Sequence, residues 1–346
     1  MSAPRGRARH TRPLAACPSC GSRELERARV DLTYVRAERP SLPHEAVIHF
    51  YLEHLFGSPR FRLTQDLCRG CALLFANPTF TDEEARRLYG EDSGPAQERA
   101  RAALLANGGR DPSPAPEAVA RSAALRARWV HRAVERDRRV RGPSARVLDH
   151  GGKRGALLAE FVREGARAYL ADLAAVGEPA PGVERVEDPA RAAPYDVILL
   201  CHVLEHVMEP RPLLERLRSL VAPDGVLYVE VPCDLDRALV DGDPGPLTHV
   251  NVFGPSSLHN ALCLAGWKPL RRRLVRSSYE GIPLPSLAWV AAPGERAERP
   301  PAPHRPWRLA AELLRLRAWR RLDRWGLPGL ARMDPGRRVP ELQPPQ

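Results

Sequence analysis

The fold is decided by residues 147–158, which read VLDHGGKRGALL. The pattern predicts the end of a buried strand, then a tight glycine turn, then the start of a helix at Ala156. In an open α/β sheet, ligands bind beyond the carboxyl ends of the strands. A glycine turn at that edge brings backbone N–H groups and a helix N-terminus close to anionic ligand groups. The stretch therefore predicts a cofactor-binding loop, with an ordinary strand-to-helix turn as the alternative.

Two nucleotide-binding templates do not fit this loop. A P-loop requires Ser or Thr after its lysine, whereas Arg154 follows Lys153, and Val147 stands where the first glycine belongs. The dinucleotide pattern G-x-G-x-x-G requires glycines at 151, 153 and 156, and only Gly151 is present. The loop therefore belongs to a different class of binding turn, or to none.

Strand-like and helix-like segments alternate around the loop. Strands are predicted at 146–149, 166–172, 182–186, 195–201, 226–232, 268–276 and 285–291, and helices at 117–141, 155–165, 210–225, 255–267 and 306–325. This alternation predicts an α/β fold with a parallel, doubly wound sheet. Because residues 173–181 form a short, Pro-bearing link, we expect the helix after the second strand to be nearly absent.

The composition bounds the possible partners. The chain has 346 residues, enough for two domains, and a net charge of +11 that would suit a nucleic-acid ligand. Apart from Lys153 and Lys268, all basic residues are arginine, which indicates compositional bias rather than a binding face. The charge also concentrates in the tail, where residues 291–346 hold twelve Arg against six Asp plus Glu. The composition therefore speaks against a nucleic-acid partner, and it says nothing of the oligomeric state.

We divide the chain into five parts. These are a disordered arm (1–13), a cysteine-bearing module (14–90), a linker (91–116), the α/β domain (117–291) and a Pro/Arg-rich tail (292–346) with one amphipathic helix. Such a basic helix packs on its own protein or lies on a membrane surface, and both readings stay open. No run of eighteen apolar residues predicts a membrane span, and we expect a cytoplasmic protein.

Four cysteines form two C-x-x-C pairs, Cys17 with Cys20 and Cys68 with Cys71. Four thiolates at this spacing suit a tetrahedral zinc ion, and a redox pair is the alternative. Because 47 residues separate the pairs, an insertion that includes HFYLEHLF (49–56) must loop out.

The glycine turn resembles the D-x-G-x-G-x-G turn of class I S-adenosylmethionine (SAM) methyltransferases. Asp149, Gly151 and Gly155 match that pattern, and Lys153 replaces the middle glycine. The resemblance implies a Rossmann-like, seven-stranded fold in which this turn packs against the methionine moiety of SAM. An ammonium at Lys153 would be placed to pair with the methionine carboxylate.

The same resemblance implies further cofactor contacts. Asp172 ends the second strand, where the family places an acid on the ribose hydroxyls, and a carboxylate can accept from both hydroxyls at once. Asp188 follows the third strand, where an acid often faces the adenine amino group; a solvated loop acid is the alternative. Cys201, the last residue of the fourth strand, is included among the cofactor contacts.

A second motif carries the chemical candidates. The stretch HVLEHVMEP (202–210), followed by PDGVLYVEVP, resembles the signature of a subset of these methyltransferases. His206 is a candidate general base, because a histidine titrates near neutral pH. His202, Glu205 and His206 could instead hold a divalent metal, as the comparable E-x-x-E-H of ubiquinone-biosynthesis O-methyltransferases suggests, or brace the loop. His249, after the fifth strand, is a rival base, and its alternative role is helix capping or packing.

The cysteine segment also has a counterpart. CRGCALLFANPTFTDEEARRLYG (68–90) resembles the zinc-knuckle module that precedes bacterial methyltransferases acting on nucleotide-linked sugars and polysaccharides. The resemblance implies SAM-dependent methyl transfer to a small-molecule acceptor, with a sugar nucleotide or glycan intermediate favoured. Two alternatives remain: an RNA methyltransferase that grips phosphate with the zinc module and arginines, and a non-catalytic zinc-binding adaptor with a degenerate methyltransferase fold.

Overall fold

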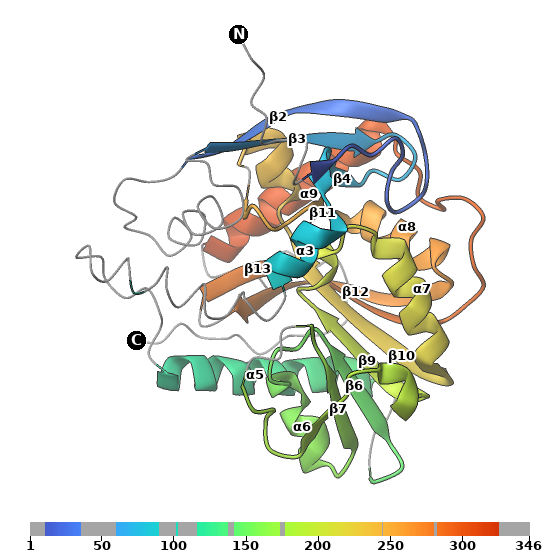
Figure 1. The fold of residues 1–346 in the computed structure, drawn as a ribbon. Helices are drawn as coiled ribbons and strands as arrows, with labels where there is room; N and C mark the ends of the chain where they lie inside the picture. Colours follow the sequence, from blue (N-terminus) through green and yellow to red (C-terminus); the bar gives the residue numbers. More distant parts are fainter. Residues whose placement is uncertain are drawn as a thin grey trace.

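The computed structural model describes residues 11–35, 60–89, 102, 116–137, 142–173, 177–243, 245–279 and 282–324. The largest sheet among these residues has seven strands in the order β12-β13-β10-β9-β6-β7-β8 (Figure 1). The strands are β6 (Arg146–His150), β7 (Arg167–Ala171), β8 (Val183–Arg185), β9 (Tyr195–Cys201), β10 (Val221–Pro232), β12 (Trp267–Tyr279) and β13 (Ile282–Pro293). Strands β6 to β10 pair in parallel, whereas β13 runs antiparallel to β10 and β12 antiparallel to β13. The predicted α/β fold with a large, mostly parallel sheet is confirmed.

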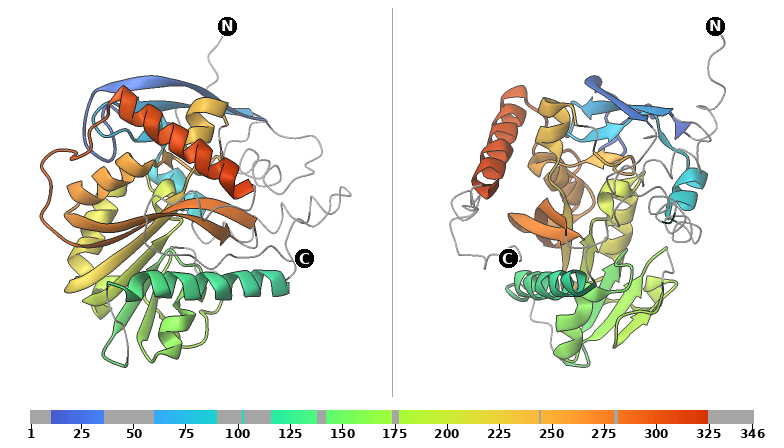
Figure 2. Two further views of the ribbon diagram at one scale, coloured as in Figure 1. Left: turned by 180° about the vertical axis from the view of Figure 1, so that it is seen from behind. Right: turned by 90° about the vertical axis from the view of Figure 1, so that its left-hand side faces the viewer.

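Helices cover both faces of this sheet (Figures 1 and 2). They are α5 (Pro116–Glu135), the 3-10 turn η2 (Ala156–Leu158), α6 (Ala159–Arg163), α7 (Pro210–Leu220) and α8 (Pro255–Leu264). In β9, Val197 and Leu199 point into a core shared with α5 and α6. Their neighbours Ile198 and Leu200 point into the other core, with α7 and α8. A strand buried on both faces reads as a continuous apolar run, which is why YDVILLC has no polar alternation.

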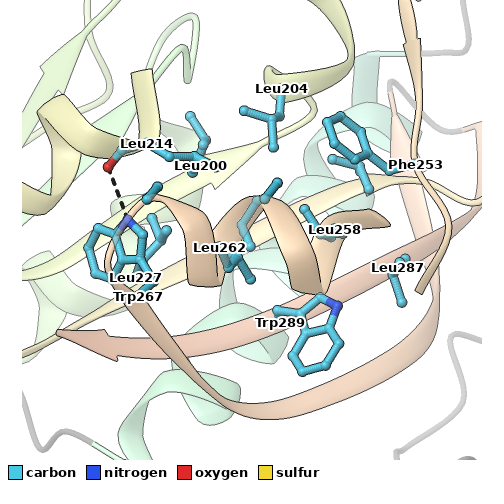
Figure 3. Close-up of a cluster of buried hydrophobic side chains, with 14 of the residues drawn as sticks. Leu200, Leu204, Leu214, Leu227, Phe253, Leu258, Leu262, Trp267, Leu287 and Trp289 are labelled. Carbon is cyan, nitrogen blue, oxygen red and sulfur yellow. Dashed lines mark hydrogen bonds between the residues drawn. The ribbon is translucent and has the colours of Figure 1, made fainter. Parts of the chain in front are cut away.

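The core on the α7–α8 side is closed by large side chains (Figure 3). Trp267, at the start of β12, is 1% exposed, and its indole N–H donates a 3.0 Å hydrogen bond to the carbonyl of Leu214 in α7. A buried tryptophan contributes a large apolar area, and its one polar atom needs a partner. Trp267 therefore ties the antiparallel edge of the sheet to the helix that follows β9.

A second, antiparallel sheet carries the cysteines. Its strands are β2 (Leu25–Val35), β3 (Arg60–Cys68), β4 (Leu74–Ala76) and β11 (Asn251–Val252), in the order β11-β4-β3-β2. Strand β11 belongs to the chain between β10 and α8, so the large domain contributes one edge of the smaller sheet. The two parts also share a core, because Leu73 and Phe75 belong to the same buried cluster as Leu148 and Leu200.

Residues 11–13 of the predicted disordered arm are among the described residues. Thr11 and Arg12 form strand β1, which pairs with β5 (Thr79–Phe80), just before helix α3 (Asp82–Tyr89). Thr11 is buried, and Arg12 forms a 2.9 Å ion pair with Glu209. The prediction of a disordered arm through residue 13 is therefore wrong for its last residues, because backbone pairing and an ion pair hold them.

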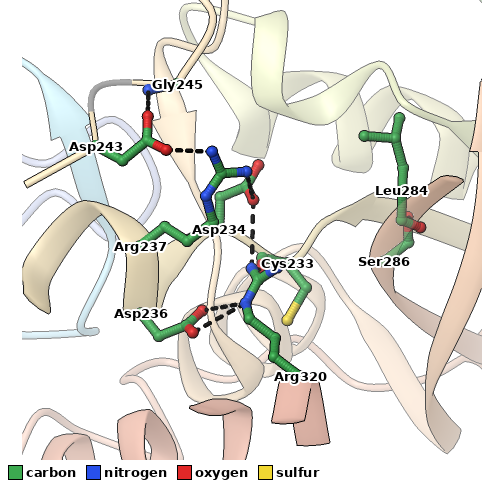
Figure 4. Close-up of polar contacts among 9 residues, drawn as sticks. All are labelled: Cys233, Asp234, Asp236, Arg237, Asp243, Gly245, Leu284, Ser286 and Arg320. Carbon is green, nitrogen blue, oxygen red and sulfur yellow. Dashed lines mark hydrogen bonds and ion pairs between the residues drawn. The ribbon is translucent and has the colours of Figure 1, made fainter. Parts of the chain in front are cut away.

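The tail helix α9 (Pro306–Arg324) packs on the protein itself (Figure 2). Leu316 and Trp319 are buried, and Arg320 forms ion pairs of 2.9 Å with Asp236 and 3.3 Å with Asp234 (Figure 4). The guanidinium of Arg320 also donates to the carbonyl of Cys233. These contacts favour the docking interpretation of this helix, and peripheral membrane contact stays a prediction.

The remaining predictions concern a helix end, the link between β7 and β8, the insertion and the membrane spans. The helix predicted over 210–225 ends at Leu220, because Val221 already pairs with Tyr195 in the sheet. The described residues between β7 and β8 (172–173 and 177–182) form no helix, as expected. The HFYLEHLF insertion and nearly all of the linker lie outside the described residues, and the domain boundaries stay predictions. Of the described helices, none combines the length and apolarity that crossing a membrane requires.

Candidate functional site

The glycine turn lies at the carboxyl edge of the large sheet, between β6 and η2. Gly151, Lys153 and Gly155 all have a left-handed backbone, with φ of 79°, 56° and 74°. A side chain at Gly151 would collide with Val203, and one at Gly155 would meet Val183 at 3.1 Å. Gly151 and Gly155 are therefore needed at these positions, because the left-handed backbone and the neighbouring side chains both disfavour a Cβ. Of the three residues, Lys153 alone carries a side chain, which disfavours its left-handed conformation.

Lys153 and Asp172 are joined through the backbone. The N–H of Lys153 donates a 2.6 Å hydrogen bond to Oδ2 of Asp172, which follows directly after β7. This contact holds the turn against the neighbouring strand end. The structure thus brings the predicted cofactor loop and the predicted ribose acid together at one edge of the sheet, as parallel neighbours in a doubly wound sheet should be.

Asp149 lies beneath the turn rather than at its surface. Its side chain is 1% exposed, and Gly152, which sequence reasoning did not select, leaves no room between the turn and the carboxylate. Burial raises the pKa of Asp149 to about 7, although Arg126 opposes that shift. Among the described residues, Oδ2 of Asp149 has no hydrogen-bond partner. The position suits a support for the loop.

The two remaining cofactor candidates are placed less favourably. Asp188 accepts a 3.1 Å hydrogen bond from the N–H of Ala190, which caps the 3-10 helix η3 (Pro189–Ala192), and it lies 3.5 Å from Arg216. These contacts agree with a structural acid as well as with the predicted adenine contact. Cys201 is buried at the end of β9, and burial raises the pKa of its thiol.

His202 lies between two buried glutamates. Its Nε2 is 3.0 Å from Oε1 of Glu230, and its Nδ1 is 3.4 Å from Oε1 of Glu205. Burial by itself would lower the pKa of His202, but the hydrogen bonds to Glu205 and Glu230 more than offset this effect and raise the pKa to about 9. The raised pKa makes His202 an imidazolium at neutral pH, with Nε2 hydrogen-bonded to Glu230 and Nδ1 in a longer ion pair with Glu205. Because a metal ligand or a base needs a free nitrogen lone pair, this arrangement favours a bracing role for His202.

The chain of charges continues through Glu230 to helix α5. Arg126 forms a 3.0 Å ion pair with Oε1 of Glu230, and the hydroxyl of Tyr228 donates a 2.7 Å hydrogen bond to Oε2. Arg126 and His202 carry two positive charges, and Glu205 and Glu230 carry two negative charges. Buried charges persist when they are paired and hydrogen-bonded. The four charges balance, but neither carboxylate oxygen of Glu205 has a hydrogen-bond partner among the described residues.

Sequence reasoning missed Arg126 and Glu230. Arg126 stands in a helix rich in Ala and Arg, where no spacing separates a buried arginine from the exposed ones. Glu230 had a readable signal, because it is a single acid within the apolar strand β10 and is fully buried. An acid in a strand buried on both faces predicts a cationic partner.

His206 has the geometry of a proton acceptor. Its Nδ1 lies 3.0 Å from the carbonyl oxygen of Thr248, and because a carbonyl only accepts, Nδ1 carries the proton. Nε2 is then the basic nitrogen of the neutral ring. It lies 3.7 Å from Oε1 of Glu205, so that a proton taken up at Nε2 would face a carboxylate. Burial would raise the pKa of Glu205, but His206 and His202 lower it to about 2, which keeps that carboxylate ionised.

His249 packs against His206, with ring centroids 4.8 Å apart in an edge-to-face arrangement. Burial, assisted by His206, lowers the pKa of His249 to about 3. Glu205, His206 and His249 each offer a ligand atom within 4.8 Å of the others. A metal at this place would therefore have His249 as its third ligand instead of the predicted His202. A divalent cation would add two charges to this buried network, which speaks for His206 as a base, whereas the unpartnered oxygens of Glu205 would suit a metal ligand; both interpretations stay open.

The two C-x-x-C pairs converge. Sγ of Cys17 lies 3.6 Å from Sγ of Cys71, Sγ of Cys20 lies 3.5 Å from Sγ of Cys68, and all four sulfurs lie within 4.8 Å of one another. A tetrahedral zinc with Zn–S bonds of about 2.3 Å requires sulfurs about 3.8 Å apart. The N–H groups of Gly70 and Cys71 point at Sγ of Cys68, at 3.3 and 3.4 Å. The donor set and its spacing therefore fit a zinc ion.

Comparison with known proteins supports the reading of the large domain. Residues 117–271 match a family model described as a methyltransferase domain. No curated protein matches the chain. Solved structures resemble it at low identity, among them the three that follow.

The first is the Burkholderia thailandensis 1,6-didemethyltoxoflavin-N1-methyltransferase, with bound 1,6-didemethyltoxoflavin and S-adenosylhomocysteine. It is 21% identical with a TM-score of 0.43, over 64% of this chain and 96% of that chain. The magnesium protoporphyrin IX methyltransferase of Synechocystis, with bound S-adenosylhomocysteine, is 18% identical with a TM-score of 0.36, over 52% and 84%. The N-methyltransferase NodS of Bradyrhizobium japonicum is 15% identical with a TM-score of 0.37, over 50% and 96%. Likeness at this level carries no information on substrate. Residues 117–271 of this protein, which include the glycine turn, thus match a methyltransferase domain and lie within an α/β fold with a mostly parallel sheet.

Proposed function

We propose that the protein is a SAM-dependent methyltransferase that acts on a small-molecule acceptor. The observation that carries this proposal is the joining of the glycine turn to Asp172 at the carboxyl edge of a methyltransferase-domain sheet. SAM supplies an activated methyl group on a sulfonium sulfur. The turn from Gly151 to Gly155 would receive the methionine moiety, Asp172 would accept from the ribose hydroxyls, and Lys153 would pair with the carboxylate.

His206 is the residue we propose as general base. When the acceptor atom gains a methyl group, the proton that it carried must leave, and Nε2 of His206 would take it. The Nδ1–H bond to the carbonyl of Thr248 fixes the tautomer, and Glu205 stabilises the imidazolium that forms. The protein also aligns acceptor and methyl group and excludes water, which is the larger part of catalysis for an activated donor.

The four cysteines would hold a structural zinc ion, which closes the ends of β3 and β4. This proposal is supported by the convergence of the sulfurs and by the N–H groups directed at Cys68. The resemblance of residues 68–90 to the module found beside sugar-modifying methyltransferases favours a sugar nucleotide or glycan acceptor. A cytoplasmic location goes with the reduced cysteines and stays part of the proposal.

The proposal is tested with SAM that carries a labelled methyl group. Purified protein is incubated with a panel of nucleoside-diphosphate sugars, and label transfer is followed by mass spectrometry. We expect transfer to at least one acceptor, and a 10²–10⁴-fold lower rate in His206→Gln, the usual size of a general-base contribution. The matched control is His259→Gln, since His259 is half-buried against Trp289 and far from the turn in the chain. Equal rates for wild type and His206→Gln would refute the base assignment.

A further inference from the structure

The turn that carries Glu205 and His206 is held by a residue of the cysteine-bearing sheet. This turn is the 3-10 segment η4 (Leu204–His206). Asn251 of β11 is 2% exposed, and its Nδ2 donates hydrogen bonds of 3.4 Å to the carbonyl of Leu204 and 2.6 Å to the carbonyl of Val207. The two carbonyls flank Glu205 and His206, so one side-chain amide binds both ends of the turn.

The residues just before Asn251 act on the ring of His206 itself. The carbonyl of Thr248 accepts from Nδ1, and the ring of His249 packs edge-to-face against it. The segment from Thr248 to Asn251 therefore determines the position of the turn, the tautomer of His206 and the packing of its ring. A ring held by these two contacts, on a turn fixed by Asn251, keeps its basic nitrogen in one direction.

This segment is in turn held by the cysteine sheet (Figure 1). In β11, Asn251 pairs with Phe75 and Val252 pairs with Leu74 of β4, and the N–H of Ala76 donates to the carbonyl of Val250 at 2.8 Å. Strand β4 begins three residues after Cys71, and it pairs with β3, which ends at Cys68. Hydrogen-bonded backbone thus connects the four sulfurs to the turn of His206 within a few residues.

A second set of contacts holds Met208 and Glu209, which follow directly after the turn. The hydroxyl of Thr79 in β5 lies 3.1 Å from Sδ of Met208, and Arg12 of β1 pairs with Glu209 at 2.9 Å. Both partners belong to the N-terminal part of the chain. The turn that carries the proposed base is thus contacted on both sides by elements outside the large sheet.

We propose that Asn251 is a positioning residue for His206, and that through β11 and β4 the metal state of the cysteine cluster controls the orientation of this proposed base. The inference rests on the proposed function for its catalytic meaning, but its structural content is independent of methyl transfer. It assigns the cysteine module a direct role in setting the active site. Loss of the metal would loosen β4, release β11 and free the ring of His206 from the Thr248 carbonyl.

The test reads the tautomer of His206 in the full-length, zinc-loaded chain at one fixed pH. Histidine is labelled with ¹⁵N, the two ring nitrogens are observed by long-range proton–nitrogen correlation, and the His206 signals are assigned from their loss in His206→Gln. In wild type we expect the Nδ1–H tautomer. In Asn251→Ala we expect the ratio of tautomers to change roughly fivefold, the size of one net hydrogen bond of about 1 kcal/mol. Removing the metal from wild type with a chelator should shift the ratio in the same direction.

The control is Ser257→Ala, at a position six residues after Asn251. It removes a buried 2.9 Å hydrogen bond that the N–H of Gly254 donates to the hydroxyl of Ser257. It should leave the His206 signals unchanged. Asn251→Ser, which is too short to reach both carbonyls, serves if Asn251→Ala does not fold. An unchanged tautomer ratio in the Asn251 variant, or in the metal-free wild type, would overturn the proposal. SAM titration of the same samples tests the proposed function separately, because Asn251 is not part of the cofactor loop.

Discussion

The buried imidazolium of His202 predicts a specific dependence of stability on pH. Substituting His202→Gln keeps a donor near Glu205 and Glu230 but removes the charge that balances them. The pKa of His202 is about 9 in the folded protein, against 6.5 for an ordinary histidine. Each tenfold change in proton affinity corresponds to about 1.4 kcal/mol, so the protonated ring contributes about 3 kcal/mol to folding.

The sign follows from the direction of the shift. A group whose pKa is raised on folding stabilises the protein fully below its unfolded pKa, and this contribution is lost as pH rises through the folded pKa. Wild type should therefore lose about 3 kcal/mol of unfolding free energy relative to His202→Gln between pH 6 and pH 9. At pH 6 the variant should be several kcal/mol less stable, because it leaves two buried carboxylates with one fewer cation.

The measurement is urea unfolding followed by tryptophan fluorescence for both proteins at pH 6, 7.5 and 9, at constant zinc. Taking the difference between the two proteins cancels the titrating groups that do not contact His202. A difference in stability that does not shrink as pH rises would refute the assignment of His202 as a buried imidazolium. It would also remove the charge-balance argument against a metal at Glu205.

Two other substitutions test the account at different places. Cys68→Ser should lower bound zinc well below one per chain and lower the melting temperature, because the free energy of metal binding stabilises the fold at such sites. Atomic emission measures the bound zinc and calorimetry measures the melting temperature. Full zinc retention would contradict the four-cysteine site. Arg320→Met should cost about 3 kcal/mol in urea unfolding, because Asp236 is 1% exposed and would lose its cation; a cost below about 1 kcal/mol would mean that α9 is not anchored by this pair.

Much of the fold could be predicted because each element had a local signature. The strand, the glycine turn and the helix start of residues 147–158 lie in consecutive positions, and YDVILLC is apolar because both of its faces are buried. The strands predicted at 268–276 and 285–291 lie within the antiparallel pair β12 and β13. The ends of helices were harder to predict. Leu220 and Val221 are both compatible with a continuing helix, yet Val221 pairs in the sheet.

The candidate site was predicted only where its residues share a motif. His202, Glu205 and His206 lie within five positions, so their proximity follows from the chain. Arg126 and Glu230 are 104 positions apart and meet only through the packing of α5 on β10. No pattern in one sequence predicts such a pair.

Asn251 shows the same limit. It reads as a polar residue in a loop, and its role appears only when β11 joins a sheet whose other strands come from the first 76 residues. Thr11 and Arg12 were assigned to a disordered arm for a similar reason, since their partners Phe80 and Glu209 lie far along the chain. Long-range pairing, rather than propensity, decides these positions.

Calorimetric titration with SAM and with S-adenosylhomocysteine, on wild type and Asp172→Ala, tests the central claim most directly. We predict that wild type binds both ligands and that Asp172→Ala binds about 100-fold more weakly, the loss of two hydrogen bonds to a charged acceptor. Folded, zinc-loaded wild type that binds neither ligand would contradict the cofactor assignment and leave the α/β domain as a non-catalytic scaffold.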